Sequence, residues 1–73
     1  MDVEATARST IAEHPEQVAG WLANRPGAWG FLAGQAILRE RGRLGRRLTE
    51  AERRLVWAAL WEQLERVRDT REL

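Results

Sequence analysis

Apolar residues along this chain of 73 amino acids recur at helical spacing, in segments separated by proline and glycine. Near the N-terminus, three of them recur every four positions: Val3, Ala7 and Ile11. This stripe predicts a helix from about Asp2 to Glu13, with the Asp2 carboxylate accepting hydrogen bonds from free amides of the first turn. Pro15 ends that helix, because the residue before a proline is pushed out of the helical conformation.

Pro15 also begins a second helix, since proline suits the first helical position. Its predicted buried face is Val18, Trp21 and Leu22. A turn over residues 24–27 then leads to a third helix from about Gly27 to Arg41, and Gly42 is predicted to end it. Gly30 and Gly34 lie inside this third helix, where each costs about 1 kcal/mol relative to alanine. We therefore expect a second helix to approach closely over them.

Residues 42–48 are predicted to form a loop rich in arginine and glycine. Thr49 and Glu52 then match a capping box, in which each side chain bonds the backbone amide of the other residue. This motif begins an amphipathic C-terminal helix over residues 49–69. Its wide apolar face is Val56, Trp57, Leu60, Trp61, Leu64 and Val67.

No segment alternates in the way that a strand requires, so the sequence predicts an all-α fold. A chain of 73 residues fits one domain, 1–73, which we expect to be a compact bundle of about four short helices. The absence of cysteine excludes disulfides and thiolate metal sites, and a single histidine, His14, excludes a zinc site built from several histidines. No nucleophile lies near a base at a known spacing, so we expect no catalytic site, cofactor or metal.

The net charge of +1 is unevenly distributed, because residues 39–54 hold seven arginines against three glutamates. The arginines of this stretch that we single out as candidates are Arg39, Arg43, Arg46 and Arg47. Guanidinium groups on a loop suit phosphate, which favours nucleic-acid binding. The alternative is a solvated loop, because this chain has no lysine and arginine takes every basic position.

Four tryptophans are many for so short a chain, and Trp57 and Trp61 lie one turn apart on the last helix. They can fill a thin core, stack on bases, or form a protein interface. The longest apolar run, Leu55 to Trp61, is far too short to span a bilayer, and the acidic N-terminus lacks an export signal. We therefore expect a cytoplasmic protein without membrane contact.

The segment 14–42 carries a spaced motif. It consists of Pro15, Val18, Trp21, Arg25, the block Gly30-Phe31-Leu32-Ala33-Gly34-Gln35, and Gly42. This pattern resembles the tail domain shared by the B subunit of the glutamyl/aspartyl-tRNA amidotransferase and the YqeY family (GatB/YqeY). It departs from that family at Ile37 and Leu38, where the family has Met-Lys, and after Gly42. The resemblance covers the tail domain alone and implies no amidotransferase activity. It implies an engagement with tRNA, and only Arg25 carries over as a basic position of the motif.

Two hypotheses follow. The leading one is a non-enzymatic helical module that binds tRNA or another structured RNA. Its expected contacts are Arg25, Arg39, Arg43, Arg46 and Arg47. The alternative is a protein–protein interaction or homodimerisation module that uses Trp57 and Trp61 of the C-terminal helix. RNA binding should be steeply salt-dependent, whereas a tryptophan-rich interface should tolerate salt.

Overall fold

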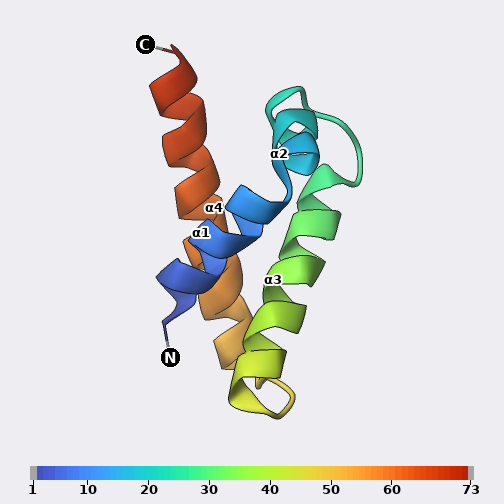
Figure 1. The fold of residues 1–73 in the computed structure, drawn as a ribbon, viewed down its shortest axis with the longest axis vertical. Coiled ribbons are helices and arrows are strands. Elements are labelled where there is room, and N and C mark those ends of the chain that lie inside the picture. Colours follow the sequence, from blue (N-terminus) through green and yellow to red (C-terminus); the bar gives the residue numbers. More distant parts are fainter. Residues whose placement is uncertain (1, 73) are drawn as a thin grey trace.

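The computed structural model describes residues 2–72 as four helices without a strand, which confirms the all-α fold (Figure 1). The helices are α1 (Val3–Glu13), α2 (Pro15–Leu22), α3 (Ala28–Leu44) and α4 (Glu50–Glu72). α3 and α4 run antiparallel and are joined at one end (Figure 1). α1 crosses in front of α4 and also contacts α3, and α2 packs on α3. At about 1.5 Å per residue, α4 is roughly 34 Å long and accounts for most of the 38 Å length of the molecule.

The helix starts follow from local capping. The Asp2 side chain accepts a hydrogen bond from the Ala5 amide at 3.0 Å, as the sequence predicts. The capping box is also confirmed: the Thr49 amide donates to the Glu52 carboxylate at 2.8 Å, and the Glu52 amide donates to Thr49 Oγ1 at 3.2 Å. His14 separates α1 from α2 and serves as the C-cap of the first and the N-cap of the second.

The core lies where α1, α3 and α4 meet. α4 contributes its largest side chains, with Leu60 and Leu64 fully buried, and α3 contributes Leu32. Small side chains at Ala7 and Ala36 are also fully buried, which lets α1 and α3 lie close to α4. α2 adds Val18 and, at lower burial, Trp21 and Leu22.

The end of α3 differs from its prediction. Gly42 stays helical, and α3 continues to Leu44 before Gly45 takes the left-handed conformation with φ of 71°. The Gly45 amide donates to the Arg41 carbonyl at 2.9 Å and closes the last turn. The extra turn holds Arg43 in the helix, three residues from Glu40, whose buried carboxylate it pairs with. The predicted loop 42–48 therefore shrinks to the connection 45–49.

The expected close approach over Gly30 and Gly34 was wrong. A Cβ added at either residue would meet no atom within 4 Å. α3 buries another face, so these two glycines lie at the surface. The tight glycine is Gly20 of α2, where a Cβ would lie 3.4 Å from Arg25 Cδ and 3.6 Å from Ala28 Cβ.

None of the four described helices is both long enough and apolar enough to traverse a lipid bilayer.

Candidate functional site

An open apolar groove follows α3 where it lies beside α4. Its volume is about 600 Å³, which is in the range of ligand and peptide sites. Its lining residues, from α3 and then α4, are Trp29, Gly30, Ala33, Gly34, Ile37, Leu38, Arg53 and Trp57. We call it the α3/α4 groove. Gly30 and Gly34 supply no side chains, so the backbone of α3 forms part of its floor.

Indole rings packed edge-to-face fix one wall of the groove. The Trp61 ring meets Trp29 edge-on, with centroids 5.4 Å apart, and meets Trp21 in the same way at 5.5 Å. The Arg68 guanidinium lies 5.1 Å from the centroid of the Trp21 ring and covers it. These contacts tie α2, α3 and α4 together and hold Trp29 in one orientation.

Trp57 and Trp61 are partly exposed to solvent. Trp57 keeps 39% of its surface exposed and Trp61 keeps 43%, and neither belongs to the hydrophobic core to which Val56, Leu60 and Leu64 of α4 contribute. Trp57 stands in the groove, and Trp61 supports Trp29 behind it. Leu38, at the rim of the groove, is 56% exposed.

A second, smaller hollow of about 190 Å³ adjoins the groove through the shared residues Ile37 and Arg53. It lies between the end of α3 and the start of α4 and is lined by Ile37, Arg41, Arg47, Leu48 and Arg53. We call it the arginine hollow. None of its three arginines forms an ion pair with a carboxylate of residues 2–71, whose side chains the structure describes. No acidic residue lines either the groove or the hollow.

The five arginines predicted for RNA do not gather at one site. Arg25 lies in the turn between α2 and α3, at the opposite end of α3 from the connection 45–49 (Figure 1), and its side chain packs over Gly20. Arg47 lines the arginine hollow. The other three, Arg39, Arg43 and Arg46, all form internal ion pairs.

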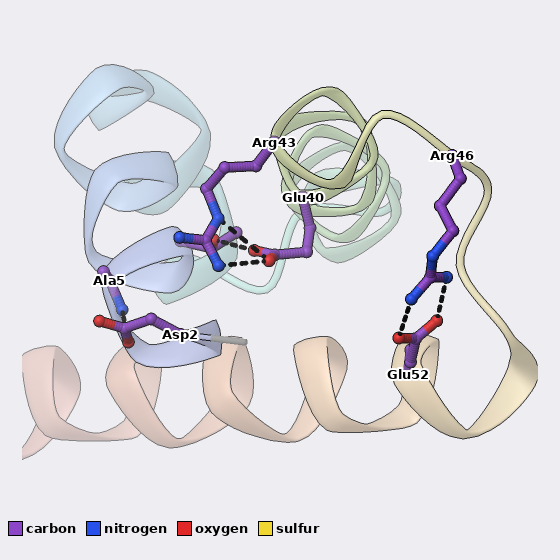
Figure 2. Close-up of polar contacts among 7 residues, drawn as sticks. Asp2, Ala5, Glu40, Arg43, Arg46 and Glu52 are labelled. Carbon is purple, nitrogen blue, oxygen red and sulfur yellow. Dashed lines mark hydrogen bonds and ion pairs between the residues drawn. The ribbon is translucent and has the colours of Figure 1, made fainter.

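These three ion pairs point in different directions. Arg39 of α3 pairs with Glu13 at the end of α1. Figure 2 shows Arg43 turned towards α1, where it meets Glu40 at 2.9 Å, and Arg46 on the other side, reaching α4. Both terminal nitrogens of Arg46 donate to the Glu52 carboxylate at 2.8 Å.

The hydrogen bonds of the Glu52 carboxylate shift its pKa. The bidentate hydrogen bonds from Arg46, and then the Thr49 amide of the capping box, lower the pKa of Glu52 from 4.5 to about 2. The pair is solvent-exposed, so its net contribution to stability is reduced by screening. It nevertheless fixes Arg46 against α4 and ties the connection 45–49 to the helix that follows.

Glu40 was not identified as a buried carboxylate from the sequence. Its side chain is 0% exposed, accepts a hydrogen bond from the Thr6 hydroxyl of α1 and pairs with Arg43 of α3. The signal was present in the helical register: Glu40 follows Leu32 and Ala36 at intervals of four on the buried face of α3. This cluster joins α1 to α3 and is structural.

His14 contacts Phe31 edge-to-face, with ring centroids 5.2 Å apart, and its side chain makes no helix-capping hydrogen bond. Among the described residues, no three His, Asp or Glu side chains gather in a way that could hold a metal ion.

Comparisons of the chain with family models, with curated proteins and with solved structures find no match.

Proposed function

We propose that this chain is a non-enzymatic protein-interaction module whose α3/α4 groove receives an apolar segment of a partner protein. The observation that carries the proposal is the groove itself: an open apolar hollow of about 600 Å³ with Trp29 and Trp57 as walls. A small soluble domain gains nothing in stability by leaving large apolar side chains in water. Their contact with a partner would remove that surface from water.

The groove is also prepared for binding before a partner arrives. Trp29 is held by Trp61, and the floor at Gly30 and Gly34 is helix backbone without side chains. Rigid aromatic anchors beside a ready hollow are features of binding hot spots, because little conformational entropy is lost on association. The partner segment would place bulky apolar side chains over the two glycines.

RNA binding is the second candidate, and the arginine hollow favours it. Arg41, Arg47 and Arg53 form no ion pair with the side chains of residues 2–71 and could contact phosphate, with Trp57 nearby for stacking. We rank it second because Arg39, Arg43 and Arg46 are engaged by carboxylates of the same chain. Phosphates would have to compete with those pairs.

Site-specific photocrosslinking in the native host tests the first proposal. A photoreactive phenylalanine analogue replaces Leu38 at the rim of the groove, and a matched variant carries it at Leu55, which is equally exposed at 56% but outside the groove. We expect a defined protein adduct from position 38 and none from position 55. A Gly34→Leu change in the same chain should abolish the adduct by filling the groove.

Each other outcome refutes the proposal. Equal adducts from both positions would show that the groove is not selective, and an adduct that ribonuclease removes would favour RNA. The absence of any adduct at position 38 would mean that the groove stays empty in the cell. An adduct between two copies of this chain would show that the module is a homodimer.

A further inference from the structure

We infer that the segment bound in the α3/α4 groove carries carboxylates directly beside its apolar anchors, and that Arg41, Arg47 and Arg53 of the arginine hollow bind them. This inference rests on the proposed function and names the chemistry of the partner. The groove and the hollow share Arg53, so one continuous ligand can occupy both.

Charge complementarity carries the inference. Three arginines line a hollow of about 190 Å³, and no carboxylate of residues 2–71 pairs with them. Most other arginines of the described chain do have such a partner, including Arg39, Arg43 and Arg46. A carboxylate in the hollow would relieve the mutual repulsion of the three cations and form charge-assisted hydrogen bonds with them.

The position of Arg53 adds to this argument. Arg53 follows the capping residue Thr49 by four positions, close to the N-terminus of α4, where the helix dipole disfavours a cation. Its neighbour Arg54 is compensated by an ion pair with Glu50 at 2.8 Å, whereas Arg53 has none among the described residues. An anion placed against Arg53 would be favoured both by the guanidinium and by the nearby helix N-terminus.

The apolar half of the ligand is set by the groove. Between Trp29 and Leu38 the groove follows α3 for about 14 Å, which matches two to three turns of a bound helix. Anchors spaced by three or four residues would fall over Gly30 and Gly34. The carboxylates would follow at the end of the segment that reaches Arg41 and Arg53. Because the arginine hollow adjoins an apolar groove, an acidic amphipathic segment fits better than a nucleic-acid backbone, which offers phosphates but few apolar groups.

The test uses the full chain and a phage-displayed library of random peptides about 16 residues long, enough for roughly four helical turns. Selected peptides should combine aromatic or aliphatic anchors with acidic residues grouped towards one end. The synthetic consensus peptide should lose affinity by about tenfold or more when its acidic residues are changed to amides. Replacing Arg41, Arg47 and Arg53 by Gln should cause the same loss, whereas the control set Arg8, Arg66 and Arg71→Gln should leave the affinity unchanged.

Four results would overturn the inference. Peptides that bind the groove without acidic residues would refute it and leave the proposed function standing. Failure to select any peptide that Gly34→Leu abolishes would refute both. A third result is that tRNA displaces the bound peptide and that the variant with Gln at Arg41, Arg47 and Arg53 loses affinity for tRNA. This result would identify the arginine hollow as an RNA-binding site. Sedimentation of the wild-type protein as a dimer that Gly34→Leu dissociates would assign the groove to a second copy.

Discussion

Replacing Gly34 by alanine should stabilise this protein, although a glycine inside a helix ordinarily marks a site of close packing. Gly34 lies within α3 and has negative φ, unlike Gly27 and Gly45, so alanine can adopt its backbone conformation. A Cβ at position 34 meets no atom within 4 Å, so the substitution creates no clash. What remains is the difference in helix propensity, because alanine has less backbone entropy to lose on folding.

The magnitude follows from that difference. Alanine is favoured over glycine in a helix interior by about 0.8–1.0 kcal/mol, so Gly34→Ala should raise the free energy of unfolding by about that amount. In a domain of this size, 1 kcal/mol corresponds to a Tm increase of about 4–8 °C. Gly30→Ala occupies an equally open position, and the double variant should therefore gain about 2 kcal/mol.

Urea titration and thermal unfolding, both followed by circular dichroism, measure the effect. Gly45→Ala is the control with the opposite sign: Gly45 has φ of 71°, where a side chain costs about 1–2 kcal/mol. A loss of stability in Gly34→Ala would refute the argument, because it would show that another part of the molecule packs on position 34. The same result would also contradict the proposed groove, because position 34 would then be covered and could not form its floor.

The polar contacts give two further predictions. Arg43→Gln should lower the free energy of unfolding by about 1–3 kcal/mol because it leaves the buried Glu40 carboxylate short of a partner, whereas Arg39→Gln at an exposed pair should cost less than about 1 kcal/mol. Equal effects of the two variants in urea titration would contradict this. Glu52 has a folded-state pKa below its unfolded value, so its stabilising contribution is complete above about pH 4.5 and is lost as the pH falls towards about 2. Glu52→Gln should therefore make the acid-induced fall in Tm shallower, and an unchanged pH profile would refute this.

Local chemistry made the helix starts predictable from the sequence. Each helix start depends on contacts within three or four residues, made by Asp2, by Pro15 or by the Thr49–Glu52 pair. These contacts do not depend on where the other helices lie. The end of α3 was predicted wrongly because Gly42 and Gly45 are both competent stops. The later stop keeps Arg43 on α3 beside Glu40, whose burial against Thr6 of α1 is a tertiary feature that the local sequence does not show.

The candidate site depended on information that the sequence does not carry locally. Arg39 was free in the sequence-based interpretation, yet Glu13 lies 26 positions away and pairs with it. Trp29 and Trp61 come from different helices, and only the packing of α3 on α4 brings them together. The composition singled out arginine and tryptophan as candidate binding residues. Their contacts within the folded chain determine which of these side chains can still contact a ligand.

The glycines of α3 connect stability to binding. Gly30 and Gly34 together cost about 2 kcal/mol, a large share of the roughly 4–11 kcal/mol expected for a domain of this length. Gly42, in the last turn of the same helix and outside the groove, has an equally open Cβ position. Leucine at position 34 or 42 should therefore leave the fold intact, but only Gly34→Leu fills the groove. If both variants keep their affinity for the peptide, the bound segment does not reach the floor of the groove, and binding does not account for the presence of glycine in α3. If only Gly34→Leu loses affinity, peptide binding requires a glycine at position 34, which accounts for a residue that lowers helix stability and that no packing contact within the chain requires.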